Sequence, residues 1–300
     1  DRHKREVYNM SKKHWAIVLV VLVLVSFLGY YVYARYPYWT KEEIEGDQTL
    51  ISTNSPASKN YNAFPKVVRI PQEFNGYENQ ILAVWYNGDS HVDNNGDGVI
   101  MGSFSRDEGK NWTEPFTVYD DPTLDCRNIG IVCAPNGTLV LFFAKVNVEK
   151  MKENKTAAWE DFGFIRSYDG GQTWEDFDSL LGLIKEHGIA TGNGYGDPVV
   201  IDDEIFLMPY GYPGNDYDET HSSFTLKSVD NGETWEWFSD LSLNTGISTG
   251  ESDFWWDNNL LFGFTRTQNA DKRYLHYFES SDRGQTWDVL TPLSFLGDCP

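Results

Sequence analysis

A glutamate and an arginine that lie 15 residues apart could be held side by side in the segment ESDFWWDNNLLFGFTR. Asn258-Asn259 is a good two-residue turn between two apolar runs, which predicts a β-hairpin. In that hairpin Glu251 faces Arg266, and directly opposed side chains have Cβ atoms about 4.5–5.5 Å apart. The hairpin would thus place a carboxylate beside a guanidinium at its open end. A structural cross-strand salt bridge is the alternative to a functional role for this pair.

A second group of polar side chains lies in the segment DNNGDGVI. Asp93, Asn95 and Asp97, with Gly98 at the turn, resemble the start of a calcium-binding loop. Position 12 of that loop would be Phe104, where a bidentate glutamate belongs. We therefore expect no metal and no cofactor, with calcium at this loop as the alternative. No HExxH, GxGxxG or P-loop motif supports metal hydrolase, dehydrogenase or kinase chemistry.

The charge balance excludes several classes of protein. The 300 residues include 24 Lys and Arg against 45 Asp and Glu, which gives a net charge of −21. Residues 1–41 hold seven basic and two acidic residues, so the rest of the chain is strongly acidic. This balance argues against a nucleic-acid partner and against a polytopic membrane protein. The aromatic content of 15% excludes a disordered chain.

A stretch of 20 uncharged residues runs from Trp15 to Ala34. As a helix it would span about 30 Å, the thickness of the hydrocarbon core of a membrane. A cleaved signal peptide is the alternative, but its apolar region would be about 7–15 residues long and would end in a small-x-small site, which YYVYAR does not supply. The sequence predicts one uncleaved transmembrane helix over residues 15–34.

The segments on either side of this helix set its expected orientation. Basic residues outnumber acidic ones before the span, so residues 1–14 are expected to form a cytoplasmic tail. Residues 35–64 contain a polar, Ser-, Asn-, Lys- and Glu-rich stretch and are expected to form a stalk. The expected localisation is therefore a single-pass membrane protein whose body, residues 65–300, lies outside the cytoplasm.

An eight-residue pattern, S-x-D-x-G-x-[TN]-W, occurs four times in that body. The copies begin at Ser105, Ser167, Ser228 and Ser280, and their aspartates are 62, 61 and 52 residues apart. Aspartate can bond the backbone amides of a turn, and glycine permits a positive φ. Each copy therefore predicts a turn between two antiparallel strands, with its tryptophan buried beneath the turn.

Runs of alternating or continuous apolar residues flank these turns, as in Thr138–Phe143 and Glu204–Met208. A period of about 50–60 residues with four short strands per repeat is typical of one blade of a β-propeller. The fold class is thus all-β, with room for about four blades over residues 65–300.

The repeated pattern resembles the Asp box of sialidases (neuraminidases) and other proteins with BNR repeats. The resemblance implies a six-bladed β-propeller, so the propeller over residues 65–300 is expected to be C-terminally incomplete. In this family the Asp boxes are structural and lie on the face away from the active site.

Further motifs extend the resemblance to functional residues. Val68-Arg69-Ile70-Pro71 resembles the [FY]-R-I-P motif whose arginine is one of three that bind the substrate carboxylate. A guanidinium presents a planar fork to a carboxylate that lysine cannot reproduce. The family also has a Glu–Arg pair at the place of Glu251 and Arg266, in which Glu assists the nucleophile and Arg binds the carboxylate. A surface ion pair is the alternative for Arg69.

The acid/base catalyst of the family is an aspartate shortly before the first Asp box. Asp93 lies 12 residues before Ser105, close to the family spacing, and the resemblance assigns it this role. The arginine that often precedes this aspartate in sialidases is missing, because Asp89 and His91 stand there.

Asp125-Cys126-Arg127-Asn128 resembles the opening of another blade. Arg127 could line the pocket or form a surface ion pair. Cys126 could form a local disulfide with Cys133, or both could be unpaired thiols.

The resemblance implies a membrane-anchored exo-α-sialidase-like glycosidase that hydrolyses terminal sialic or related acidic sugars with retention. Arg69 and Arg266 would hold the carboxylate, Asp93 would protonate the leaving oxygen, and Glu251 would take the proton from a tyrosine nucleophile. The third arginine and the tyrosine come from the family's last two blades, and neither can be assigned in this chain. A sialylated or other acidic glycan is the expected partner. The alternative is a propeller that binds glycan or protein without hydrolysis.

Overall fold

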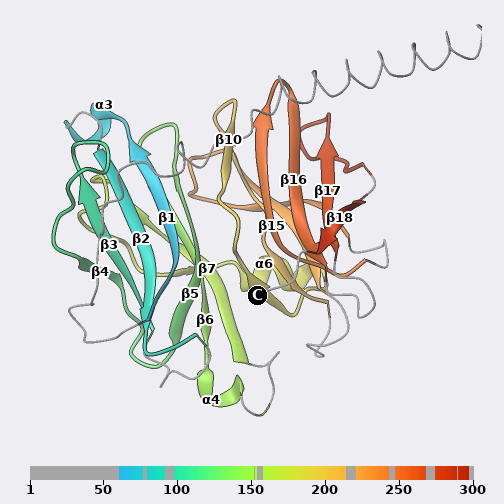
Figure 1. Cartoon of the computed structure of the whole chain (residues 1–300), viewed down its shortest axis with the longest axis horizontal. Helices are drawn as coiled ribbons and strands as arrows, with labels where there is room; N and C mark the ends of the chain where they lie inside the picture. Colours follow the sequence, from blue (N-terminus) through green and yellow to red (C-terminus); the bar gives the residue numbers. More distant parts are fainter. Residues whose placement is uncertain are drawn as a thin grey trace, which may run out of the picture. The chain divides into compact units, whose positions relative to one another are not determined.

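The chain folds into antiparallel sheets that follow one another in sequence order (Figure 1). This computed structural model describes residues 61–76, 80–91, 98–151, 153, 158–213, 221–242, 247–267, 274–288 and 290–296. The chain divides into two compact units, Asp1–Gln48 and Thr49–Pro300, and every described residue belongs to the second. The predicted tail, transmembrane helix and most of the stalk lie outside the described residues. No helix within the described ranges is long and apolar enough to cross a membrane.

The first two sheets each contain four strands in sequence order. Blade 1 consists of β1 (Tyr61–Ile70), β2 (Gln80–Gly88), β3 (Val99–Ser105) and β4 (Phe116–Tyr119), with α3 (Gln72–Asn75) between β1 and β2. Blade 2 consists of β5 (Asp125–Cys133), β6 (Leu139–Val146), β7 (Trp159–Ser167) and β8 (Asp178–Ser179), with α4 (Val148–Met151) between β6 and β7.

Blade 3 is a six-stranded sheet that fills four strand positions, because the strands at its first two positions are each interrupted. It follows α6 (Leu181–Glu186) and contains β9 (Thr191–Asn193), β10 (Val199–Ile201), β11 (Glu204–Leu207), β12 (Tyr210–Tyr212), β13 (Ser222–Ser228) and β14 (Glu236–Asp240). β11 and β12 share the second position, because both pair with β13. β9 and β10 share the first position, because β9 pairs with β12 and β10 pairs with β11. Pro198 and Pro209 lie at the two interruptions, where a residue without an amide hydrogen cannot continue the ladder.

Blade 4 again has four strands in order: β15 (Thr249–Asp257), β16 (Leu260–Thr267), β17 (Tyr274–Ser280) and β18 (Thr291–Leu296). Four consecutive blades in a propeller-like arrangement agree with the predicted all-β fold and with the expected four blades.

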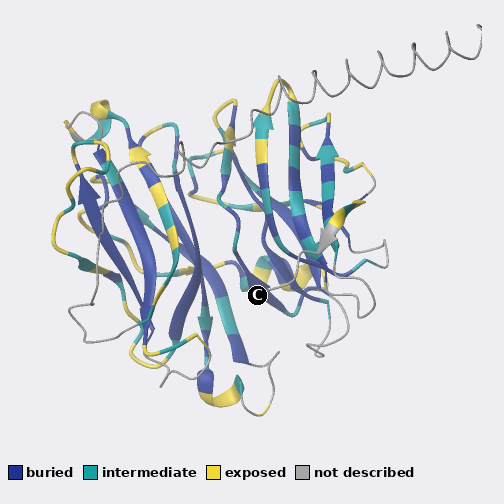
Figure 2. Cartoon of the chain, in the orientation of Figure 1, coloured by how far each residue is buried: buried dark blue, intermediate teal, exposed yellow. Residues whose placement is uncertain are grey.

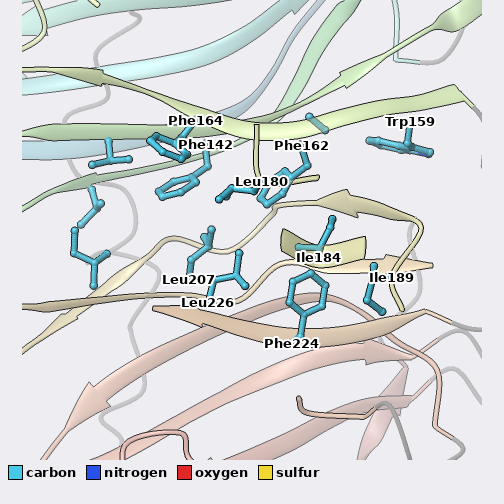
Figure 3. Close-up of a cluster of buried hydrophobic side chains, with 14 of the residues drawn as sticks. Phe142, Trp159, Phe162, Phe164, Leu180, Ile184, Ile189, Leu207, Phe224 and Leu226 are labelled. Carbon is cyan, nitrogen blue, oxygen red and sulfur yellow. The ribbon is translucent and has the colours of Figure 1, made fainter. Parts of the chain in front are cut away.

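Apolar side chains from facing sheets fill the spaces between neighbouring blades, and Figure 2 shows buried residues along the strands and exposed ones at many turns. Phe142, Phe162 and Phe164 of blade 2 lie against Leu207 and Leu226 of blade 3, as seen in Figure 3. A separate cluster joins blades 1 and 2, and another joins blades 3 and 4. Each blade therefore depends on its neighbour for its core.

The four Asp boxes form the predicted turns. In the second box, the Asp169 carboxylate accepts bonds from the amide and hydroxyl of Thr173, at 2.9 and 2.6 Å, and the Ser167 hydroxyl accepts one from the Gly171 amide at 2.8 Å. The glycines at the corresponding positions of the four boxes all have φ between 83° and 89°. The box tryptophans are half-buried rather than buried, and each packs against a core cluster.

The two cysteines of β5 are unpaired. Cys126 and Cys133 lie near opposite ends of one extended strand, which holds them too far apart for a disulfide, so the local disulfide is wrong and the alternative of free thiols is right. Burial raises the pKa of Cys133 to about 11, which keeps it in the thiol form at neutral pH.

Candidate functional site

Strand register defines two ends for each blade. Ser105 opens the first Asp box and pairs with Ile81, and Ser280 opens the fourth and pairs with Leu261. We call the end that carries the Asp boxes the box end, and the opposite end the bulge end.

The bulge end is named for an irregularity in the first strand of every blade. β1 is bulged between Ala63 and Lys66, β5 between Arg127 and Gly130, and β15 between Thr249 and Ser252. In blade 3, residues 194–198 interrupt the first strand between β9 and β10. Bulges re-aim side chains and are common beside active sites, so this end is the candidate functional site.

Glu251 and Arg266 meet at the bulge end of blade 4. The predicted turn forms, with Asn258 and Asn259 at φ 50° and 63°, and Asp257 pairs with Leu260. Arg266 Nη1 donates to Glu251 Oε1 at 3.0 Å. The side chains are 17% and 28% exposed, so both remain open to solvent. The predicted contact is therefore confirmed, whereas the catalytic and binding roles of the two residues remain predictions.

Arg69 does not join this pair. It is exposed near the end of β1 and pairs with Ile81, which in turn pairs with Ser105, so it lies at the box end. The physical reason is the short connection through α3, which keeps the last residues of β1 close to the first residues of β2. The assignment of Arg69 to a shared site with Arg266 is corrected accordingly.

Asp93, Asn95 and Asp97 fall within residues 92–97, outside the described residues. The acid/base role of Asp93 and the alternative calcium loop therefore both remain predictions. Within the described residues, no group of three or more His, Cys, Asp or Glu side chains is arranged to hold a metal ion.

Arg127 forms a buried ion pair with Asp125, not a surface one. The Asp125 side chain is fully buried and that of Arg127 is 5% exposed. The Arg127 guanidinium also donates to the His91 carbonyl at 2.9 Å and lies over the Tyr86 ring. Through these contacts the Arg127 guanidinium joins blade 2 to blade 1, so Arg127 has a structural role.

Aromatic rings gather beside this ion pair. Phe64, at the β1 bulge with φ 54°, lies 5.8 Å from the rings of both Tyr86 and Tyr195, measured between centroids. Tyr61 stacks on His91 at 6.0 Å. Tyr195 comes from the interruption of blade 3, so these rings link blade 1 to blade 3 at the bulge end.

A cluster of three charged residues was missed in the sequence. Lys66 Nζ of β1 lies 3.3 Å from Asp197 Oδ2, and the Asp197 amide donates to Asp253 Oδ1 of β15 at 3.3 Å. We call Lys66, Asp197 and Asp253 the axial cluster, because they come from blades 1, 3 and 4. A side chain at residue 196 would meet the Ser252 carbonyl at 2.4 Å, so Gly196 permits the close approach of blade 3 to blade 4.

The two acids of the axial cluster hold protons more readily than ordinary aspartates. Burial raises the pKa of Asp197. The Lys66 ammonium opposes this rise, and the Ile131 amide opposes it to a smaller extent. Burial also raises the pKa of Asp253, Lys66 again opposes the rise, and the charge of Asp197 adds to it. Nothing in the sequence indicates that these three residues meet, although Pro65 and Pro198 beside two of them indicate breaks in the strands.

The chain is similar to known proteins over most of the propeller. Residues 79–296 match the model of the family described as BNR repeat-like domain. A protein named sialidase from Bacteroides fragilis (strain YCH46) is 29% identical over 137 residues, which cover 39% of this chain and 24% of that protein. The chain thus spans about a quarter of this curated relative.

Solved structures share the fold at low identity. A protein of unknown function from Dyadobacter fermentans DSM 18053 has a TM-score of 0.65 and 18% identity, covering 80% of this chain and 71% of that chain. The Hadza microbial sialidase Hz136 has a TM-score of 0.61 and 16% identity over 79% and 47%. The Trypanosoma rangeli sialidase in complex with 2,3-difluorosialic acid has a TM-score of 0.61 and 16% identity over 78% and 38%.

Proposed function

Since this chain belongs to the superfamily of sialidases and BNR-repeat proteins, we propose that it is a sialidase-like glycoside hydrolase with its site at the bulge end. The substrate class is a glycan that ends in sialic acid or a related acidic sugar. The observation that carries the proposal is the contact between Glu251 and Arg266, on the end opposite the Asp boxes.

The chemistry of this pair suits an acidic sugar. A guanidinium can bind a carboxylate through two parallel hydrogen bonds. The Glu251 carboxylate can accept a proton from a hydroxyl nucleophile. In the proposed retaining mechanism this nucleophile is a tyrosine outside this chain, and Asp93 protonates the leaving oxygen. Arg69 has no part in the proposal.

We also propose that the propeller has six blades and is anchored by residues 15–34, with its body outside the cytoplasm. The coverage of the solved sialidases, 47% and 38%, leaves room for further blades in those proteins. Protease added to intact cells is expected to remove the body, and complete protection would reverse the proposed orientation.

Binding without hydrolysis is the second candidate function, and the position of Arg69 favours it. The loss of this arginine from the site leaves fewer guanidinium groups at the bulge end than the resemblance implies. A propeller with a weaker grip on its ligand can still recognise a glycan without distorting it for cleavage.

Two measurements on the complete protein, purified in detergent, separate these functions. Release of 4-methylumbelliferone from its sialoside reports hydrolysis, and calorimetric titration with sialic acid reports binding. Hydrolysis should fall about 100-fold or more in Glu251→Gln, which removes the proposed base. Arg266→Lys should lose both activities, because an ammonium cannot reproduce the planar fork.

Arg283→Lys is the matched control, because Arg283 also pairs with a carboxylate, that of Asp202, but lies within the fourth Asp box. It should behave like the parent protein. Binding of sialic acid without any release of the fluorophore would favour the binding function. The absence of both would overturn the proposal for sialic acid.

A further inference from the structure

Ion pairs at the bulge end differ in how far solvent reaches them. The side chains of Arg127 and Asp125 are 5% and 0% exposed, so a ligand cannot separate them without entering the core. In the axial cluster Lys66 is 16% exposed and Asp197 is 45% exposed. An incoming anion could therefore displace the Asp197 carboxylate and pair with Lys66 in its place.

The contacts of Asp197 are incomplete on one side. Its Oδ2 atom faces Lys66, whereas its Oδ1 atom is buried without a hydrogen bond of good geometry among the described residues. A buried carboxylate oxygen without a well-oriented donor is unfavourable, and protonation removes the charge that makes its burial costly. Asp253 lies on the other side and adds a second negative charge against a single lysine.

Among the described residues of the neighbouring strands, the nearby charged groups already form ion pairs. β5 approaches Asp197 through Gly130 and the amide of Ile131. β16 places Phe264 opposite Asp253. The other charged residues near the bulge ends of these strands form the pairs Asp125–Arg127 and Glu251–Arg266. The axial cluster therefore carries one net negative charge until one of its acids takes up a proton.

Building on the function proposed above, we propose that Lys66 is a ligand-binding cation and that Asp197 is its internal competitor. Without a ligand, the Asp197 carboxylate forms an ion pair with the ammonium group of Lys66. When the Asp197–Asp253 pair takes up a proton, Lys66 becomes available to the carboxylate of an acidic sugar.

The direction of the pH dependence follows from the same contacts. A ligand carboxylate that takes over Lys66 removes the cation that holds the pKa of Asp197 down, so Asp197 gains a proton on binding. A ligand whose binding is coupled to proton uptake binds more tightly as the pH falls. One unit of pKa corresponds to about a tenfold change in affinity.

The test is calorimetric titration of the complete protein in detergent with sialic acid at pH 5.0 and pH 7.5. The parent protein should bind about tenfold more tightly at pH 5.0. Asp197→Asn should bind equally well at both values, because a neutral amide does not hold the lysine. Lys66→Met should bind weakly at both, and Asp202→Asn, at the box end, should retain the parent's dependence. The methyl ester of sialic acid, which has no charge, should show no such dependence.

A second measurement needs no ligand and separates this inference from the proposed function. In protein labelled with ¹³C-aspartate, the Asp197 signal, assigned by its loss in Asp197→Asn, should titrate above the ordinary value of about 3.9. It should move further up in Lys66→Met. An Asp197 signal that titrates at or below the ordinary value overturns the inference whether or not sialic acid binds. The inference is also overturned if sialic acid binding by Asp197→Asn depends on pH as it does in the parent protein. A raised titration without binding of sialic acid would instead count against the proposed substrate alone.

Discussion

The Asp197 amide donates a hydrogen bond to the Asp253 carboxylate across the boundary between blades 3 and 4, at 3.3 Å. Asp197 precedes Pro198, in the segment where blade 3 interrupts its first strand. The same residue therefore contacts blade 4 through its backbone and blade 1 through its side chain, which bonds Lys66. The interruption in the first strand of blade 3 therefore connects blades 1, 3 and 4.

The Arg127–Asp125 pair should be essential for folding although it is closed to ligands. Arg127→Met leaves a fully buried carboxylate without its cation, and we expect a loss of about 3–5 kcal/mol in the free energy of unfolding. The double variant Asp125→Asn/Arg127→Met should recover part of this loss, because no charge then remains buried. Urea denaturation followed by circular dichroism measures both changes. A single variant as stable as the parent would contradict the structural role.

The Asp boxes should make stability depend on pH in the acid range. Burial alone would raise the pKa of Asp169, but the bonds from the Thr173 hydroxyl and amide outweigh it and hold the pKa below its ordinary value. A carboxylate with a lowered pKa contributes stability at neutral pH, and this contribution disappears as the pH falls through the lowered value. Asp169→Asn should lower the Tm at pH 7 and flatten its fall towards pH 3.

Asp176→Asn is the control for this change, because Asp176 is an exposed aspartate just after the same box. Its Tm should follow that of the parent at every pH. Differential scanning fluorimetry from pH 3 to pH 7 gives the comparison. Equal slopes for the Asp169 variant and the parent would show that the box contributes no pH dependence.

The interface between blades 2 and 3 should be the most sensitive part of the core to truncation. Phe142 is fully buried and its ring contacts those of Phe164 and Trp235. Phe142→Ala should cost about 3–5 kcal/mol, through lost burial and the cavity left behind. Val229→Ala, at an apolar residue that is 61% exposed, should cost little. Chemical denaturation measures both, and similar costs for the two variants would be inconsistent with this core.

The turn of the blade 4 hairpin should tolerate glycine but not a β-branched residue. Asn258 and Asn259 both have positive φ, a conformation that costs most side chains about 1–2 kcal/mol. Asn259→Val should therefore destabilise the protein, whereas Asn259→Gly should be neutral or slightly stabilising. Thermal denaturation of the two variants provides the test, and a valine variant that is as stable as the glycine one would exclude this turn.

The features that the sequence predicts correctly here are those that depend on neighbouring residues. Each Asp box is a turn of eight residues, and the contact of Glu251 with Arg266 follows from counting outward from Asn258-Asn259. The bulge between Thr249 and Ser252 was not predicted, because nothing in the local pattern distinguishes it from regular strand.

The errors and omissions concern relations between distant residues. A motif resemblance placed Arg69 in the site, but the register of β1 against β2 decides which end of the blade it occupies. The axial cluster joins residues from three blades, and Asp197 and Asp253 are 56 residues apart. No period or spacing in the sequence indicates that these side chains meet, because their approach depends on the packing of whole sheets.

Every blade is built from one uninterrupted segment of the chain, and this has a consequence for how the protein acquires its structure during synthesis. The four sheets occupy residues 61–119, 125–179, 191–240 and 249–296, without exchange of strands between them. Each sheet can therefore pair its strands as soon as its own segment has left the ribosome. The apolar face of each new sheet remains uncovered until the next one is complete. During translation, each completed sheet should therefore expose an apolar surface until the next sheet covers it. A chaperone would be most useful while such a surface is exposed.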